Sequence, residues 1–271
     1  MNALFGLDAY SPREIAQRVS AVGVEKVGLP LPTLVLLGLL GGAFIGLGAM
    51  MFTLVASDPS PGFAVSRLLG GLAFSLGLLL VVVAGAELFT GNNLIVMAWA
   101  SGRVGTGALL RNWAVVCVAN FVGAAVLACL VWLSGHAGLN DGRVGAAAVQ
   151  IATAKAQLPL VEAFFRAVLC NALVCMAVWM AMGGRSVADK AVAIVFPVTA
   201  FVASGFEHSV ANMYLYPLAL LLGAPLSVAD IAGNLLCVIA GNVVGGAVLV
   251  AGIYWVVYLR TPGSPERVDR R

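Results

Sequence analysis

Two acidic residues stand alone within long uncharged stretches of this 271-residue sequence. Glu87 is the single charged residue between positions 68 and 102, and Glu207 is the single one between 191 and 229. An ionisable side chain in so apolar a segment is costly to bury and is a functional candidate by default. The alternative is that each carboxylate stabilises its own loop, and both interpretations stay open at this point.

The two glutamates belong to strings that repeat along the chain. Residues 85–92 read GAELFTGN and residues 205–212 read GFEHSVAN. At a separation of 120 positions the recurring pairs are Gly85 and Gly205, Glu87 and Glu207, and Asn92 and Asn212. At a separation of 122 the recurring pairs are Asn120 and Asn242, and Gly123 and Gly245. The sequence therefore contains two related halves.

A histidine and a threonine add further polar chemistry to the two strings. His208 follows Glu207 directly, and histidine is the side chain whose charge changes near neutral pH. Thr90 lies in the other string and could hydrogen-bond an imidazole ring or a small anion. Both residues also have a simpler interpretation, since a buried histidine is often only a satisfied core residue and a threonine often bonds its own helix carbonyls.

The composition decides what kind of protein must position these residues. Hydrophobic residues make up 61% of the chain and charged residues 10%, whereas soluble domains carry about 25% charged residues. Soluble enzymes, nucleic-acid binders and disordered scaffolds are therefore excluded. The five cysteines lie in apolar runs without metal-ligand spacing, so the sequence predicts neither a metal nor a cofactor.

Uncharged runs predict six membrane-spanning helices, because each span needs about 20 apolar residues. The runs are 27–57, 68–102, 112–140, 167–184 with an extension back to Pro159, 191–229 and 231–259. We therefore expect an all-α integral membrane protein. Its predicted parts are an amphipathic cytoplasmic segment at 1–26, a six-helix transmembrane domain at 27–260 and a cytoplasmic tail at 261–271.

The distribution of lysine and arginine predicts the orientation of the chain in a cell (inner or plasma) membrane. If the N-terminus is inside, eleven of these residues lie on the inner side and four on the outer side. The four outer residues are Arg67, Arg143, Lys155 and Arg166. Positive residues are concentrated on the cytoplasmic side of membrane proteins, so both termini should be cytoplasmic.

Helices 2 and 5 are expected to be broken at the repeated strings. The run 68–102 is too long for one straight crossing, and three spans per half invert the second half relative to the first. Interrupted helices at matching positions of an inverted repeat are a common plan of transporters. A break frees backbone groups that lipid cannot satisfy. We expect four side chains to bond these groups: Glu87, Glu207, Asn92 and Asn212.

At these strings the sequence resembles the formate/nitrite transporter family, and its formate branch most. The resemblance is carried by GAELFTGNNL at 85–94, a segment ending in Lys155, LCNALVCMAVWM at 169–180, ASGFEHSVANM at 203–213 and GNVVGGAVLVAGIYW at 241–255. It implies an aquaporin-like protomer of six helices, a homopentamer sealed at its central axis, and one pore per protomer. The pore would pass small monovalent anions, with or without a proton.

The resemblance also implies roles for individual residues. The pore centre falls on Thr90 and His208, beside Glu207. The outer approach falls on Lys155, which on sequence alone could be a simple loop charge, and on Asn171. Narrow apolar constrictions fall on Phe74, Leu78, Leu88 and Phe201. The remaining pore-lining or structural residues are Glu87, Asn92, Asn212 and Asn242.

We therefore expect a membrane channel or transporter for formate, working with lipid and a small anion as partners and without nucleic acid. Nitrite is the close alternative, and hydrosulfide or another weak-acid anion is a further one. Either His208 gives the anion a proton, or a cationic centre holds it during the crossing. An intramembrane enzyme is the rival class, but the chain has two histidines and neither an HExxH nor a GxSxG motif. A membrane scaffold without transport is the third class.

Overall fold

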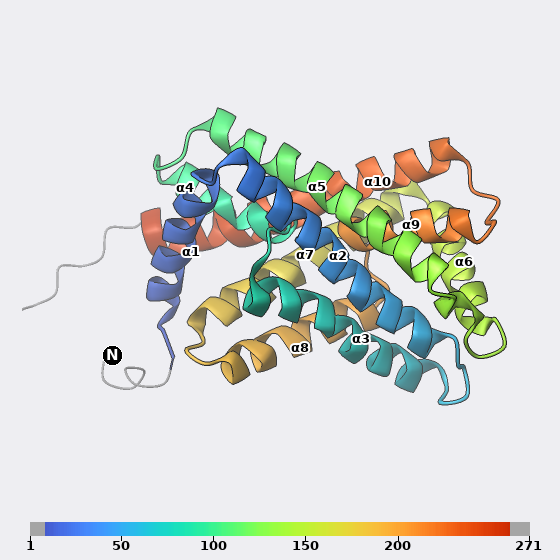
Figure 1. The fold of residues 1–271 in the computed structure, drawn as a ribbon. Helices are drawn as coiled ribbons and strands as arrows, with labels where there is room; N and C mark the ends of the chain where they lie inside the picture. The colour runs from blue at the N-terminus through green and yellow to red at the C-terminus, as the bar shows by residue number, and fades with distance from the viewer. Residues whose placement is uncertain (1–8, 261–271) are drawn as a thin grey trace, which may run out of the picture.

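The computed structural model describes residues 9–260, and within them every regular element is a helix. The helices form one elongated bundle (Figure 1). This confirms the all-α fold class. The predicted tail at 261–271 and the first eight residues of the predicted N-terminal segment lie outside the described residues.

The predicted amphipathic segment forms helix α1, Pro12–Val27, which lies across one end of the bundle. Ser11 caps its first turn and forms a reciprocal capping box with Glu14. One face of α1 is buried through Ile15, Ala16 and Val19. The segment is therefore a packed part of the protein as far as it is described.

Five helices are long and apolar enough to cross a membrane. They are α2 (Leu31–Ala56), α3 with its extension η1 (Phe63–Leu79 and Leu80–Gly85), α5 (Thr106–Leu133), α7 (Leu160–Gly183), and α10 (Val228–Val243) continued by η4 (Val244–Gly252), α11 (Ile253–Trp255) and η5 (Val256–Arg260). Their outward faces are apolar: Leu36, Val118 and Leu236 are each more than half exposed. Such a surface suits lipid rather than water.

Two helical stretches are interrupted where the repeated strings lie. After Gly85 the chain is not helical over residues 86–90 and then forms η2 (Gly91–Ile95) and α4 (Val96–Ala100). Helix α8 (Val187–Ala203) is separated in the same way from α9 (Ser209–Leu221) by residues 204–208. Gly85, directly before the first interruption, and Gly205, within the second, have φ of 92° and 70°, a region that favours glycine.

The helix bounds differ from the sequence prediction most clearly around α5. The third span is α5, Thr106–Leu133, rather than 112–140, and it includes Arg111. A second helix, α6 (Arg143–Ala156), follows the short turn η3 (His136–Gly138), and it carries Lys155 in its last turn. Lys155 is thus a helical residue and not a loop charge. The prediction started this span after Arg111 because charged residues were taken as helix limits. A long arginine side chain can, however, extend from a helix end towards water.

The helices pack closely at small residues. A side chain at Gly42 in α2 would collide with the carbonyl oxygen of Asn120 in α5, and one at Gly123 in α5 would collide with that of Leu39. Small residues at a helix interface let two backbones approach closely within lipid. The α2–α5 contact thereby fixes Asn120 beside the first interruption.

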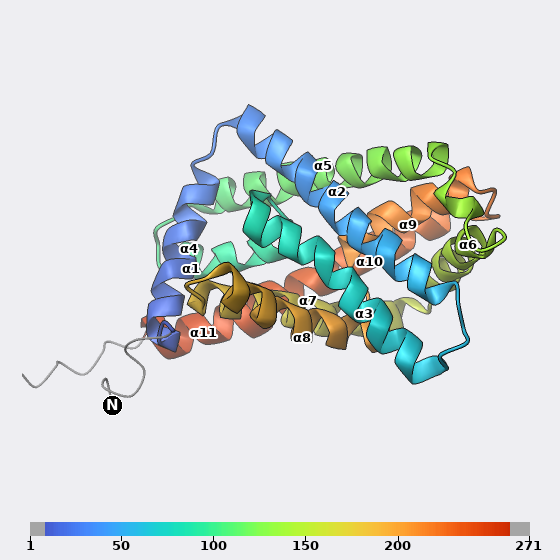
Figure 2. The same cartoon turned by 60° about the horizontal axis from the view of Figure 1, so that its bottom comes forward.

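The bundle has two distinct ends (Figure 2). We call the end with α1 and the connections 28–30, 101–105 and 184–186 the α1 end. The opposite end carries α6 and the connections 57–62 and 222–227, and we call it the α6 end. Helix α3 starts at the α6 end and α8 starts at the α1 end, so the two interrupted stretches approach the middle from opposite sides.

Candidate functional site

The two interruptions meet at one side-chain contact in the middle of the bundle. The Nε2 atom of His208 lies 3.1 Å from the Oγ1 atom of Thr90, and both residues are buried. The sequence predicted both residues for the centre of a pore, and the structure brings them together. The imidazole ring also stacks on Phe201, with ring centroids 5.9 Å apart and an interplanar angle of 17°.

The second ring nitrogen of His208 assigns the tautomer. His208 is the N-cap of α9, and its Nδ1 accepts the backbone N–H of Ala211 at 3.2 Å. A nitrogen that accepts a hydrogen bond carries no proton, so in the neutral ring the proton is on Nε2. His208 is therefore the donor and Thr90 the acceptor in this arrangement. A doubly protonated ring would have to release the N-terminus of α9.

Glu207 belongs to a buried network with a lysine and two asparagines, which we call the Lys155 network. The Nζ atom of Lys155 lies 2.8 Å from Oε1 of Glu207, and Nδ2 of Asn212 donates to Oε2 at 2.8 Å. Asn212 also donates to Asn234 at 3.0 Å, and Asn234 donates to the backbone carbonyl of Lys155 at 2.9 Å. The predicted anion-attracting lysine is thus paired with the glutamate beside His208.

Glu87 belongs to a matching set, which we call the Lys26 network. The Nζ atom of Lys26 lies 2.6 Å from Oε1 of Glu87, and Asn92 donates to Oε2 at 2.6 Å. Asn92 also donates to Asn112 at 3.0 Å, and Asn112 donates to the backbone carbonyl of Lys26 at 3.4 Å. A lysine, a glutamate and two asparagines are thus joined in the same order in both halves of the chain, and Lys26 alone makes a further bond, to Oδ1 of Asn92 at 3.0 Å.

Three members of these networks were not predicted from the sequence: Lys26, Asn112 and Asn234. A signal for them was present. Asn112 and Asn234 are separated by 122 positions, as are Asn120 and Asn242, and Lys26 precedes Lys155 by 129. Lys26 was missed because the repeat was not extended to the segments that form α1 and α6.

The backbone of each interruption is held by a different asparagine. Asn120 donates to the carbonyl of Glu87 at 2.9 Å and accepts the N–H of Phe89 at 2.8 Å. Asn242 donates to the carbonyl of Glu207 at 3.0 Å and accepts the N–H of Ser209 at 3.0 Å. These two side chains satisfy groups that lipid could not.

The expectation that four other side chains would bond the freed backbone is therefore wrong. The carboxylates of Glu87 and Glu207 accept from lysine ammonium and asparagine amide groups instead. The side-chain amides of Asn92 and Asn212 donate to the carboxylates and to further asparagines. A carboxylate prefers a cationic partner because a charge-assisted bond offsets more of its desolvation cost.

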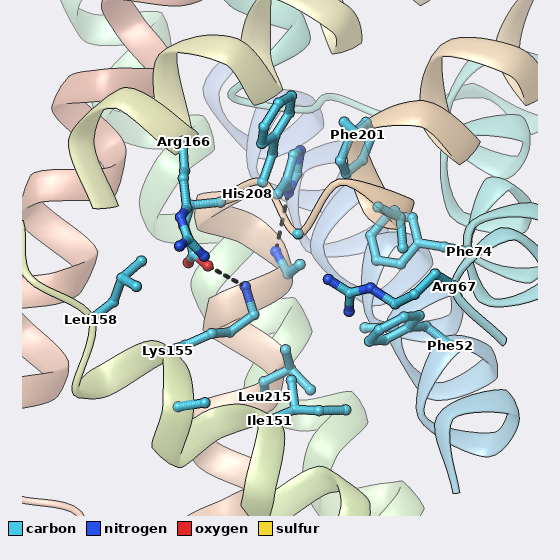
Figure 3. Close-up of a pocket in the computed structure, with 17 residues that line it drawn as sticks. Phe52, Arg67, Phe74, Ile151, Lys155, Leu158, Arg166, Phe201, His208 and Leu215 are labelled. Carbon is cyan, nitrogen blue, oxygen red and sulfur yellow. Dashed lines mark hydrogen bonds and ion pairs between the residues drawn. The ribbon is translucent and has the colours of Figure 1, made fainter. Parts of the chain in front are cut away.

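A cavity of about 210 Å³ opens beside His208 towards the α6 end, and we call it the α6-end cavity. Phe74 and Phe201 line it and contact each other edge to face, with ring centroids 5.7 Å apart. Lys155, Arg67 and Arg166 also line it (Figure 3). The two predicted constriction residues Phe74 and Phe201 thus lie together at the inner part of a basic cavity.

A second cavity of about 420 Å³, the α1-end cavity, lies on the other side of the interruptions. The predicted constriction residues Leu78 and Leu88 line it, together with Lys26, Glu87 and Asn92. Thr90 lines neither cavity and has no exposed surface. The two apolar pairs and the His208–Thr90 contact therefore separate the two cavities.

Asn171 lies elsewhere than the sequence prediction placed it, whereas Asn242, predicted as pore-lining or structural, holds the backbone of the second interruption. Neither lines a cavity described above, and both are fully buried. The amide of Asn171 donates to Asn93 at 2.9 Å and to the carbonyl of Asn242 at 2.6 Å. Asn171 is part of the packing behind the interruptions and does not line the outer approach. Within residues 9–260 no group of histidine, cysteine and acidic side chains could hold a metal ion.

These features define a class of membrane protein. An apolar bundle has two interrupted helices of opposite direction, a polar contact where the interruptions meet, and a cavity on either side. This is the arrangement of a membrane transport protein with its site near the middle of the bundle. Residues 13–256 match the family model of the formate/nitrite transporters. The chain belongs to that family, which confirms the resemblance noted from its motifs.

Curated relatives agree with this membership. The chain is 40% identical to the formate channel FocA of Escherichia coli strain K12 over 274 aligned residues, which cover 93% of this chain and 96% of the relative. It is 38% identical to the formate channel BtFdhC of Bacillus thuringiensis, covering 92% and 96% of the two chains. It is 37% identical to a probable formate transporter of Methanothermobacter thermautotrophicus, covering 94% and 99%.

Solved structures agree as well. A pentameric formate channel with formate bound is 38% identical, with a TM-score of 0.78 over 84% of this chain and 98% of that chain. An ion channel of the same family is 31% identical, with a TM-score of 0.81 over 92% of this chain and 99% of that chain. The relatives named here are channels or transporters of the membrane.

Proposed function

We propose that this protein is a membrane channel for small monovalent anions, and that formate is its main substrate. The observation that carries the proposal is the contact of His208 with Thr90, buried between two apolar constrictions that separate a cavity at each end. The formate channels among its relatives supply the choice of substrate. Nitrite is the alternative, since it shares the charge and the two-oxygen shape of formate, and hydrosulfide is a further one.

The proposed path runs along the bundle. An anion enters the α6-end cavity beside Lys155, passes Phe74 and Phe201, and reaches the Nε2–H of His208 in exchange for its bond to Thr90. It then passes Leu78 and Leu88 and leaves through the α1-end cavity beside Lys26. Moving an anion through apolar constrictions costs several kcal/mol or more unless hydrogen bonds compensate. The Nε2–H group is the donor placed where that cost is highest.

The tautomer restricts how a proton could accompany the anion. A neutral ring that gave up its Nε2 proton would become an imidazolate, so proton transfer requires a ring that is already protonated on Nδ1. Protonating Nδ1 removes the acceptor of the Ala211 N–H. We propose that the neutral ring serves as a hydrogen-bond donor to the anion, and that proton transfer occurs only when the first turn of α9 is released.

The proposed arrangement in the membrane has three parts. The chain crosses a cell membrane six times, with α8 and α9 together making one of the crossings. Both termini and the α1 end face the cytoplasm, because eleven of the lysine and arginine residues fall on that side. Five copies assemble into a homopentamer with one pore in each, as in the pentameric relative. Residues 27–260 form the channel domain in this proposal.

The test is flux in proteoliposomes, measured for formate, nitrite and lactate between about pH 5 and pH 8, a range around the unperturbed histidine pKa near 6.5. We expect formate to move unchanged, which separates a channel from an enzyme, and a scaffold would give no flux. His208→Phe should stop uptake, and His208→Asn should lose activity or conduct with a flat pH profile. Flux of wild-type rate and pH profile in His208→Asn would remove the residue from the mechanism.

A further inference from the structure

The α6-end cavity carries more positive charge than its one acidic residue balances. Three cationic side chains line it, those of Arg67, Lys155 and Arg166, against the single carboxylate of Glu207. Lys155 is paired with Glu207. Arg166 is paired with Glu162, which is exposed and is not part of the lining. Arg67 forms no ion pair within residues 9–260.

One hydrogen bond, from the Nε atom, holds the guanidinium of Arg67 in place. Its Nε atom donates to the carbonyl of Ala203, the last residue of α8, at 3.1 Å. A guanidinium has five N–H groups, so four remain on the two Nη atoms. These four have no hydrogen-bond partner among the described residues, and Figure 3 shows the guanidinium pointing into the cavity. Its orientation is therefore fixed while its paired N–H groups stay free.

The interruption between α8 and α9 leaves room for this arginine. A side chain at Gly205 would place its first carbon 2.6 Å from Nη2 of Arg67, which is closer than such carbons come to other atoms. Gly205 thus does more than allow the positive φ of the turn. It also provides the space in which the guanidinium lies against the start of the break.

Arg67 and Arg166 lie at a different depth from the His208–Thr90 contact. Their side chains are partly exposed, and Figure 3 shows them on opposite sides of the cavity with Lys155 between them. His208 is only 2% exposed. The cavity volume of about 210 Å³ exceeds the share of one water in liquid water, about 30 Å³, several-fold, so a hydrated anion fits at the mouth.

We propose that Arg67, with Arg166, forms an anion-binding site at the mouth of the α6-end cavity that selects planar anions with two oxygens. Two parallel N–H groups of a guanidinium match the two oxygens of a carboxylate, which a lysine ammonium cannot do. Formate and nitrite both have this shape, whereas chloride and hydrosulfide do not. The site would bind the anion before it reaches the apolar constriction.

The proposal extends the proposed function, because it takes the α6-end cavity to be the entrance of the pore. Formate uptake at a series of concentrations tests it with Arg67→Gln, Arg67→Lys and Arg166→Gln. Arg143→Gln is the matched control, since Arg143 is an exposed arginine at the same end that does not line the cavity. Arg166→Gln matters because it leaves the bond between Arg67 and Ala203 intact.

We expect Arg67→Gln to raise the half-saturating formate concentration about tenfold, which is the effect of losing one charge-assisted hydrogen bond, at an unchanged maximal rate. Arg166→Gln should raise it by a smaller factor, and Arg143→Gln should leave it unchanged. Arg67→Lys keeps the charge but loses the paired N–H groups. It should therefore bind formate more weakly than the wild type and become sensitive to inhibition by chloride.

Formate binding to the purified oligomer in detergent, measured by calorimetry, gives a readout without transport. Wild-type binding without flux would reject the proposed function and leave the arginine site standing. Wild-type half-saturation in both Arg67→Gln and Arg166→Gln, with the oligomer intact, would overturn the site. Arg67→Lys that equals the wild type, chloride inhibition included, would overturn its selectivity for two-oxygen anions.

Discussion

At the residue scale, the partner of each ring nitrogen determines what His208 can do. Nδ1 is occupied by the N–H of Ala211 and Nε2 points at Thr90, so the geometry favours one neutral tautomer with its proton towards the other interruption. Removing the hydroxyl of Thr90, the acceptor, should therefore disturb the imidazole ring of His208, the donor. Thr90 is the residue at which this can be tested without changing a charge.

Thr90→Val keeps the shape of the side chain and removes the hydroxyl, so we expect a loss of formate flux. The buried Nε2–H would be left without an acceptor, at a cost of about 1–3 kcal/mol, and the ring would lose its fixed orientation. Thr90→Ser retains the hydroxyl and should retain most of the flux. Flux in proteoliposomes checks both variants. Equal flux in the valine and serine variants would show that the hydroxyl is dispensable.

The two lysine–glutamate pairs offer a second prediction at this scale. Lys155→Met leaves Glu207 buried without its cation, and removing one partner of a buried pair costs about 3–5 kcal/mol. We expect a clearly lower midpoint of thermal unfolding, and the same for Lys26→Met beside Glu87. Adding Glu207→Gln to Lys155→Met should recover part of the loss, since no buried charge then remains unpaired.

The matched control for both lysines is the exposed pair of Arg166 and Glu162. Its side chains are 41% and 53% exposed, so Arg166→Gln should change stability by less than about 1 kcal/mol. If Lys155→Met unfolds at the same temperature as Arg166→Gln, the Lys155 network does not hold the fold together.

At the element scale, the interruptions depend on how closely the neighbouring helices approach. Gly42→Ala would add a carbon against the backbone of Asn120, the residue that holds the carbonyl of Glu87 and the N–H of Phe89. We expect the variant to give much less folded oligomer, because two backbones would have to separate. Gly107→Ala in α5 is the control, since nothing lies within 4 Å of an added carbon there.

Gly107→Ala should be neutral or stabilising by up to about 1 kcal/mol, because alanine favours a helix more than glycine does. The yield and thermal unfolding of the purified oligomer measure both variants. A normal oligomer of Gly42→Ala with unchanged stability would contradict the close packing of α2 against α5.

The elements also show which parts of the fold a sequence can predict. The interruptions could be placed, because a glycine, an acid and an asparagine within an apolar run leave few other arrangements. Helix α6 could not be placed, because it has 14 residues and carries Arg143, Gln150 and Lys155, so it resembles a polar connection when read by charge. The ion pairs were missed for the same reason, since each joins an interruption to a short helix at the bundle end.

At the scale of the whole molecule, the internal repeat includes more of the chain than the motifs indicated. The Lys26 and Lys155 networks share four matching bonds, and the contacts of Asn120 with the first interruption match those of Asn242 with the second. The repeat therefore extends from α1 and α6, through the interrupted helices, to α5 and α10. The two cavities differ in charge, however, because Arg67 and Arg166 line the α6-end cavity and no arginine among residues 9–260 lines the α1-end cavity.

Because the two halves have the same fold in opposite directions, we expect the distribution of lysine and arginine to set the orientation of the molecule in the membrane. That orientation can be measured. A cysteine at Ser186, in the connection between α7 and α8, should lie in the cytoplasm, and one at Asp141, at the α6 end, should lie outside. Both positions are exposed, and both can be introduced after the five native cysteines are replaced. A membrane-impermeant maleimide should then label Asp141→Cys in intact cells and should label Ser186→Cys only after the cells are opened. Labelling of Ser186→Cys from outside would invert the molecule and assign the α1-end cavity, with Lys26, to the outer entrance of the pore.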